Sequence, residues 1–91
     1  MQFEWDEAKA NSNLSKHGIS FEEATSVFSD PLFLTFADPE HSFLEKRFII
    51  IGESLKARLL IVAYTDRSGS TRLISARIAT RKERKAYESD L

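Results

Sequence analysis

The stretch RFIIIGESLKARLLIVAYTDRSGSTRLISARI, residues 47–78, decides the fold of this 91-residue chain. Three runs rich in β-branched and aromatic residues lie within it, at residues 47–53, 58–66 and 72–78. The connections between them, 54–57 and 67–70, are too short for the crossover that parallel strands require, so they predict antiparallel hairpins. A fourth extended run, residues 32–37, precedes them, and together the four predict a curved antiparallel sheet.

Helix signals flank this sheet on its N-terminal side. Asp6 offers a side-chain oxygen as an N-cap for a helix over about residues 7–17, and Gly18 suits its left-handed terminator. Ser20 and Glu23 form a capping box that predicts a second helix.

The ends of the remaining elements are also marked. The second helix should stop before the Asp30-Pro31 pair, and Thr80 with Glu83 opens a last short helix. Alternating residues at 3–5 could form a short first strand. We therefore predict an α+β fold with two N-terminal helices packed on one face of about four antiparallel strands, followed by a short C-terminal helix.

The size and composition predict one small soluble domain over residues 1–91. The chain holds three glycines, two prolines and no cysteine, which leaves no linker, disulfide or thiolate metal site. Its longest apolar run, 59–64, is too short to span a bilayer, and the first residues lack a basic region. We expect a cytoplasmic protein without a membrane partner.

Charge is strongly segregated along the chain. Residues 1–45 contain two basic and nine acidic side chains, whereas residues 46–85 contain eleven basic and three acidic ones. A formal net charge of −1 therefore hides a basic half that could present a local positive field to a polyanion such as RNA.

Several short motifs, in order along the chain, together resemble the BrnT family of type II toxins. They are FEWDEAK (3–9), KHGISFEEA (16–24), VFSDP (27–31), EKR (45–47), YTDR (64–67) and ISAR (74–77). The resemblance runs from residue 3 to about residue 88. It implies a RelE-like fold, an endoribonuclease that inhibits translation, and no cofactor. It also implies a BrnA-like ribbon-helix-helix antitoxin that binds operator DNA and forms a hetero-oligomer with the toxin.

The first strand pair of the stretch gathers charged residues on one face. If the two ends of the 54–57 loop face each other, counting backward places Arg47 opposite Thr65. The same count places Glu45 opposite Arg67, and all four share a face because side chains alternate along a strand.

The next strand pair leaves two registers open. If Thr65 faces Leu73, Arg77 shares the face of this cluster, whereas a shift of one residue brings Arg72 there and turns Arg77 away. We favour Arg77, because the other register would leave the packed face poorer in apolar side chains.

Metal-free RNA cleavage requires proton transfer and stabilisation of a phosphorane that carries extra negative charge. Arginine suits the second role, because its planar group can bind two phosphate oxygens. We assign Arg47, Arg67 and Arg77 to the scissile phosphate, and Glu45 or His41 to proton transfer. An ion pair between Glu45 and Arg67, or a solvated loop position for His41, would be the purely structural alternative.

Further basic residues are candidates for binding RNA outside the reacting group. They are Lys46, Arg58, Arg72 and Arg81. Lys16 and His17 are assigned instead to the end of the first helix, where positive charge stabilises the helix dipole. The spacing of histidines and carboxylates indicates no metal site. A non-catalytic module that binds RNA or protein through the same basic face is the alternative function.

Overall fold

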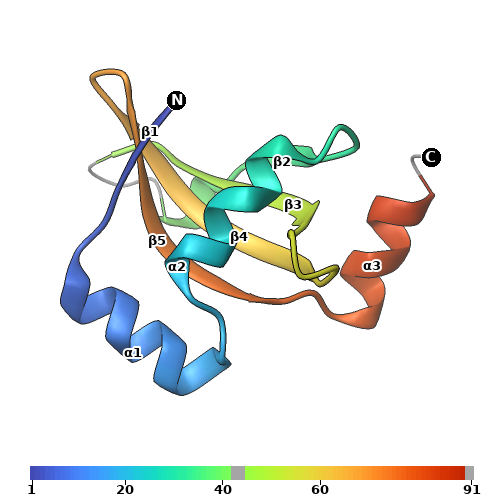
Figure 1. Cartoon of the computed structure of the whole chain (residues 1–91). Coiled ribbons are helices and arrows are strands. Elements are labelled where there is room, and N and C mark those ends of the chain that lie inside the picture. Colours follow the sequence, from blue (N-terminus) through green and yellow to red (C-terminus); the bar gives the residue numbers. More distant parts are fainter. Residues whose placement is uncertain (42–44, 90–91) are drawn as a thin grey trace.

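The computed structural model describes residues 1–41 and 45–89. Its elements, in chain order, are β1 (Gln2–Glu4), α1 (Glu7–His17), α2 (Phe21–Thr25), the 3-10 helix η1 (Ser26–Ser29), β2 (Leu34–Ala37), the 3-10 helix η2 (Pro39–His41), β3 (Arg47–Glu53), β4 (Leu59–Arg67), β5 (Ser70–Ile78) and α3 (Arg81–Glu88). Figure 1 shows a curved sheet with α1 and α2 to one side and α3 at the far end.

The sheet is mixed and has five strands in the order β1-β5-β4-β3-β2. The four predicted strands form its antiparallel part, whereas β1 adds a fifth strand parallel to β5. The prediction of about four antiparallel strands was therefore incomplete. A three-residue strand carries too little periodicity to reveal its partner.

The helices begin as predicted, with the side chains of Asp6, Ser20 and Thr80 as their N-caps. The second helix differs from the prediction, because α2 ends at Thr25 and the chain continues as η1 up to Asp30. The α-helical hydrogen bonds give way there to a tighter turn that leads into Pro31.

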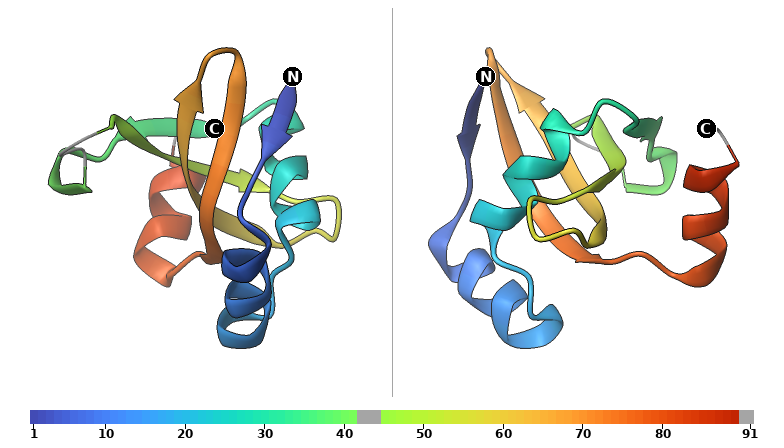
Figure 2. Two further views of the ribbon diagram at one scale, coloured as in Figure 1. Left: turned by 90° about the vertical axis from the view of Figure 1, so that its left-hand side faces the viewer. Right: turned by 45° about the vertical axis from the view of Figure 1, so that its right-hand side comes forward.

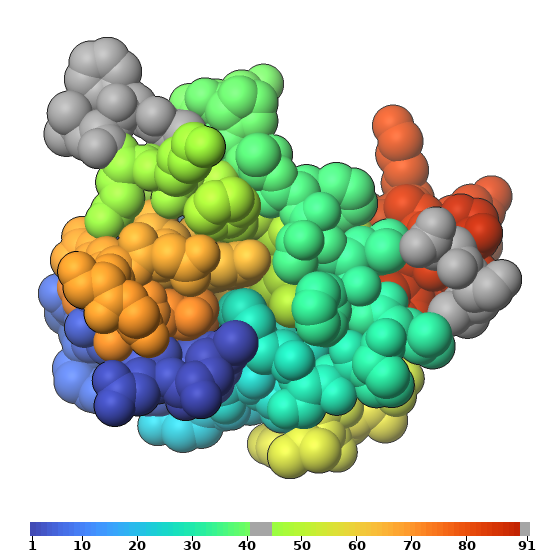
Figure 3. Space-filling model, turned by 90° about the horizontal axis from the view of Figure 1, so that it is seen from above, coloured from blue at the N-terminus to red at the C-terminus, as the bar shows by residue number. Residues whose placement is uncertain are grey.

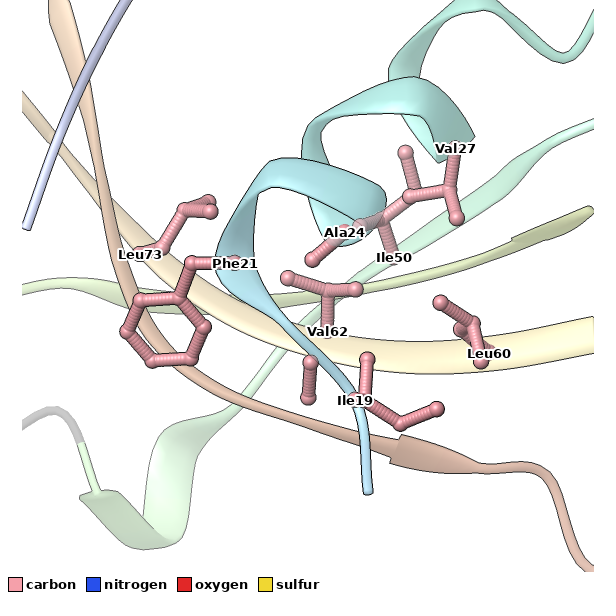
Figure 4. Close-up of a cluster of buried hydrophobic side chains, with 9 residues drawn as sticks. Ile19, Phe21, Ala24, Val27, Ile50, Leu60, Val62 and Leu73 are labelled. Atoms are coloured by element: carbon pink, nitrogen blue, oxygen red, sulfur yellow. The ribbon is translucent and has the colours of Figure 1, made fainter. Parts of the chain in front are cut away.

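The main core lies between the sheet and the segment formed by α2 and η1. It comprises Ile19, Phe21, Ala24, Val27, Ile50, Leu60, Val62, Leu73 and Ala76, of which Figure 4 labels all but Ala76. A second cluster on the opposite face joins Ile51, Leu59 and Ile61 to Tyr87 of α3. The sheet is thus packed on both faces, and α3 covers only part of the second one (Figure 2).

The helix α1 lies against the side of β5 that β1 leaves open. Strand β1 pairs only with residues 70–72 of β5. Beyond them, the Asn13 side chain donates hydrogen bonds to the carbonyl oxygens of Ala76 (2.8 Å) and Ile19 (3.0 Å). Its Oδ1 accepts from the Ala76 N–H at 3.0 Å. The prediction that both N-terminal helices pack on a sheet face therefore holds for α2 but places α1 wrongly, because Asn13 holds it at an edge.

The C-terminal helix is fixed by two polar contacts. Arg77 on β5 donates two hydrogen bonds of 2.8 Å to Glu83 on α3. The Tyr87 hydroxyl donates to Asp30 at 2.6 Å, and burial with this hydrogen bond raises the pKa of Tyr87 to about 12. No helix in the part of the chain that the structure describes has the length and apolar character needed to cross a membrane.

The ion pair of Glu83 gives an expected pH dependence. The pKa of Glu83 is lowered from 4.5 to about 2, and the hydrogen bonds from Arg77 are the largest cause. Because the folded pKa is lower than the unfolded one, the stabilisation is complete above pH 4.5 and is lost as pH falls toward 2. We expect Glu83→Gln to lower the free energy of unfolding at pH 7 by about 1–2 kcal/mol, which allows for partial solvent screening.

Thermal melts between pH 7 and pH 2 measure this effect, with Glu88→Gln as the control. Glu88 faces Arg84 at 4.0 Å on the exposed side of the same helix. The wild-type protein should lose stability below pH 4.5 more steeply than Glu83→Gln does. Equal acid-induced losses for these two proteins would contradict the prediction.

Candidate nucleic-acid interface

Arg47, Thr65 and Arg72 form a row across three neighbouring strands, here called the basic row. Arg47 on β3 lies directly opposite Thr65 on β4, as the first hairpin predicted. Thr65 in turn lies directly opposite Arg72 on β5. Directly opposed residues share one face of a sheet, so an arginine stands on each side of Thr65. The Arg72 guanidinium lies 4.0 Å from the Glu4 carboxylate of β1.

A β-bulge explains how Arg72 reaches this row. Tyr64 pairs with Leu73 but Ala63 pairs with Ser75, so β5 carries one extra residue at this point. The predicted pairing of Thr65 with Leu73 is therefore wrong. Arg77 still shares the face of the basic row, because its partner is Ile61, four residues before Thr65.

The Thr65 side chain is buried at the centre of the row. The residue is 2% exposed, and its hydroxyl makes no hydrogen bond of normal geometry with the residues that the structure describes. It lies near enough to the Glu45 carboxylate to help lower the pKa of Glu45. Because buried hydroxyls are normally well paired, a hydroxyl with only this loose contact is available to a ligand oxygen.

Glu45 and Arg67 form an ion pair beside the basic row, as the strand register predicted. Arg67 donates from Nε to one carboxylate oxygen at 2.7 Å and from Nη2 to the other at 3.2 Å. The hydrogen bonds from Arg67 are the largest cause that lowers the pKa of Glu45, and the nearby charge of Arg72 adds to it. Glu45 is therefore ionised near neutral pH and can accept a proton, but it cannot act as a general acid.

Arg67 keeps part of its guanidinium group for another partner. Both hydrogen bonds to Glu45 use the edge formed by Nε and Nη2. Within residues 1–41 and 45–89, no hydrogen bond involves Nη1, and the side chain is 48% exposed. The guanidinium can therefore hold a carboxylate on one edge and offer donors to a phosphate oxygen on the other.

An apolar strip borders the basic row on the same face. Phe36 on the edge strand β2 lies opposite Ile49, which lies opposite Ala63. Phe36 is 48% exposed. Proteins that bind single-stranded nucleic acids often combine an exposed aromatic ring with neighbouring arginines, because bases stack on the ring while phosphates bind the cations.

Two of the predicted site residues are engaged in ion pairs elsewhere. Arg77 is bound to Glu83 of α3, and four residues of β4 separate its row from the basic row, about 13 Å along the strand. Arg58 donates to Glu23, whose carboxylate is almost fully buried and also accepts from the Ser54 hydroxyl at 2.7 Å. The structure does not bring either arginine into the basic row.

Three predicted site residues remain to be placed in the fold. His41 ends η2, and its side chain lies outside what the structure describes. Lys46 is exposed just before β3, and Arg81 is exposed at the start of α3. Figure 3 shows the tip of the β4–β5 hairpin beside the N-terminus, with α3 on the other side of the molecule.

The sequence analysis placed Arg72 in this row only in the register that it did not favour, assigned it to outer RNA contacts, and overlooked Phe36. The bulge that brings Arg72 into the row has no marker in the sequence, because it follows from packing on both faces of β5. The position of Phe36 could not be predicted, because the long connection 38–46 leaves the register between β2 and β3 undetermined by the sequence. In the described ranges, no three side chains of the kinds that bind metals gather at one place.

Comparison with known proteins connects this chain to a family. Residues 5–83 match the family described as the ribonuclease toxin BrnT of type II toxin-antitoxin systems. Among solved structures, the chain is similar to the ribonuclease toxin BrnT of Brucella abortus, known from a crystal structure at 1.1 Å resolution. The two share 25% sequence identity and a TM-score of 0.66 over 89% of this chain and 99% of the other. A search of curated proteins finds no match.

Proposed function

The chain belongs to the BrnT family of ribonuclease toxins of type II toxin-antitoxin systems, and from this membership we propose that it cleaves single-stranded RNA at the basic row without a metal ion. The observation that supports the proposal is the buried Thr65 hydroxyl, which lies between Arg47 and Arg72 and makes no hydrogen bond of normal geometry with the described residues. These groups can hold the phosphate whose bond is broken. Arg67 and Glu45 lie beside them.

The reaction that suits this site is attack of a ribose 2′-hydroxyl on the neighbouring phosphorus. The new bond forms between the 2′-oxygen and phosphorus, and the bond to the 5′-oxygen breaks. The products then carry a 2′,3′-cyclic phosphate and a 5′-hydroxyl. Arginines flanking the phosphate stabilise the extra negative charge of the phosphorane, which is the role that a metal ion plays in other nucleases.

Glu45 is our candidate for the base that removes the 2′-hydroxyl proton. Its ion pair with Arg67 lowers its pKa and so weakens it as a base in the free protein. Arg67 can keep one edge on Glu45 while its other edge binds a phosphate, so the ionised carboxylate stays in place to accept the proton. His41 remains the candidate that returns a proton to the 5′-oxygen, and Lys46, Arg58, Arg77 and Arg81 remain candidates for outer contacts with RNA.

The partner in this proposal is a cognate antitoxin. Membership in a type II toxin-antitoxin family implies such a partner and an RNA substrate. We propose that it is a BrnA-like ribbon-helix-helix protein that binds operator DNA, and that it covers the basic row in a hetero-oligomer. Acidic or amide side chains from the antitoxin could pair with Arg47 and Arg72. The free toxin would inhibit translation in the cytoplasm by cleaving RNA.

Incubation of a labelled single-stranded RNA with the purified protein tests metal independence. We expect equal cleavage rates with and without EDTA, because the charge stabilisation comes from arginines. End analysis should find cyclic phosphate and 5′-hydroxyl termini. Loss of cleavage in EDTA that added Mg²⁺ restores would contradict the proposed mechanism.

A further inference from the structure

A hollow between α1 and β5 gathers the basic residues of an otherwise acidic half of the chain. Lys9 and Lys16 are the two basic side chains among residues 1–45, and both line this hollow. His17 and Ser12 of the same helix line it as well, and Ser75 of β5 closes the other side. The hollow has a volume of about 250 Å³ and no acidic residue in its lining. We call it the α1–β5 hollow.

The position of the two lysines is fixed by Asn13. The Asn13 side chain is buried and hydrogen-bonded to the backbone of Ala76, so this side of α1 faces β5. Lys9 precedes Asn13 by four residues and Lys16 follows it by three, which places both on the same side of the helix. They therefore flank the Asn13 anchor and face the edge of β5.

These cations have no partner within the described parts of the chain. Among the described residues, no ion pair or hydrogen bond joins an acidic side chain to the ammonium group of Lys9 or Lys16, although the Lys9 backbone N–H donates to Asp6. Arg58, Arg67 and Arg77, by contrast, are each paired with a glutamate. Lys9 and Lys16 are seven residues apart, which is about 10.5 Å along the helix, so each ammonium group approaches the hollow from its own end. An anion between them would be attracted by both charges.

The hollow adjoins the face that carries the basic row. Ser75, which lines the hollow, pairs with Ala63, and Ala63 precedes Thr65 by two residues on β4. Arg72 precedes Ser75 by three residues on β5, so their backbones are at most about 11 Å apart. Strand β1 pairs with β5 only as far as Arg72, so no strand among the described residues pairs with this edge of β5 between the row and the hollow.

We propose that the α1–β5 hollow binds a backbone phosphate of the RNA substrate, a few nucleotides from the phosphate that is cleaved. The proposal rests on the function assigned to the basic row above. Lys9 and Lys16 supply the charge, and the Ser12 and Ser75 hydroxyls can donate to phosphate oxygens. The hollow thus extends the substrate site around the open edge of β5 and makes affinity depend on RNA length.

The double variant Lys9→Ala/Lys16→Ala tests this proposal, with Lys56→Ala/Lys82→Ala as the matched control. The control removes two exposed lysines from the β3–β4 loop and from α3. We expect the KM for a 20-nucleotide RNA to rise about tenfold in the test variant, with little change in kcat. The KM for a dinucleotide should stay at the wild-type value, because it is too short to reach the hollow.

Salt dependence of RNA binding gives a readout that needs no cleavage. The slope of log affinity against log salt should fall by about 0.7 in the test variant, because the contact with one phosphate of a single strand is lost. Lys9→Arg/Lys16→Arg should keep the wild-type slope, which separates loss of charge from loss of folding. An unchanged slope and KM in the alanine variant, or an equal rise in KM for both RNAs, would overturn the proposal.

A free mononucleotide is the other source of phosphate that the hollow could bind. Adenosine monophosphate could bind to the wild-type protein and not to the alanine variant. If the alanine variant nevertheless kept the wild-type KM for the 20-nucleotide RNA, the RNA subsite would be refuted. A wild-type protein that binds RNA with the expected salt slope but cleaves none would refute the proposed function and leave the hollow standing.

Discussion

Replacing Arg67 by alanine should slow RNA cleavage at least about 100-fold and leave the melting temperature almost unchanged. Loss of one preorganised donor to a developing negative charge typically costs that much in kcat. Arg67 is half exposed and bound only to Glu45 among the described residues, so its removal opens no cavity in the core. Glu45 would also lose the group that holds its carboxylate beside the basic row.

Single-turnover cleavage of labelled RNA measures this effect, together with a thermal melt of each variant. Arg67→Lys keeps the charge but cannot hold a carboxylate and a phosphate on two edges, so it should recover only part of the rate. Lys56→Ala is the control, because the β3–β4 loop lies at the opposite end of β3 from Arg47. Full activity of Arg67→Ala would refute the assignment of the site.

Arg72→Ala extends the same prediction to the row itself. Arg72 and Arg47 stand on either side of the buried Thr65 hydroxyl, so loss of Arg72 should reduce cleavage as strongly as loss of Arg67. The predicted register placed Arg77, not Arg72, in the cluster, so a strong effect of Arg72→Ala would support the observed register.

The hairpin of β3 and β4 shows what a sequence can reveal. A short loop and a strict alternation of side chains were enough to place Arg47 opposite Thr65, and the Glu45–Arg67 ion pair follows from the same count. Both predictions use local geometry, in which a neighbour in space is close in sequence.

Contacts between residues that are far apart in the sequence could not be predicted from this local geometry. Arg58 was predicted to contact RNA, yet the Glu23 side chain, which was predicted to complete a capping box with Ser20, binds Arg58 from 35 residues away. The parallel pairing of β1 with β5 depends on how α1 and α2 lead the chain back to β2. The family resemblance, confirmed over residues 5–83, supplied the function that these local rules could not.

Asn13→Ala should produce the largest loss of stability among the changes considered for this chain. The Asn13 side chain makes three hydrogen bonds to the backbone, two at Ala76 and one at Ile19, and only 6% of the residue is exposed. Alanine would leave a buried N–H and two carbonyl oxygens without these partners. We expect the free energy of unfolding to fall by about 3 kcal/mol, because unpaired buried groups keep their full desolvation cost.

For a domain of this size, that loss corresponds to a melting temperature lower by about 10–20 °C. Asn11→Ala is the matched control, since Asn11 is exposed on the same helix and the change raises helix propensity equally. Asn13→Asp refines the test, because its carboxylate can still accept from Ala76 N–H but cannot donate to either carbonyl oxygen. If Asn13→Ala melted as Asn11→Ala does, the edge of β5 would not need this side chain. A much lower melting temperature for Asn13→Ala would instead show that the Asn13 amide supplies the hydrogen bonds that β5 lacks beyond the end of β1. The same amide would then fix the helix that carries Lys9 and Lys16.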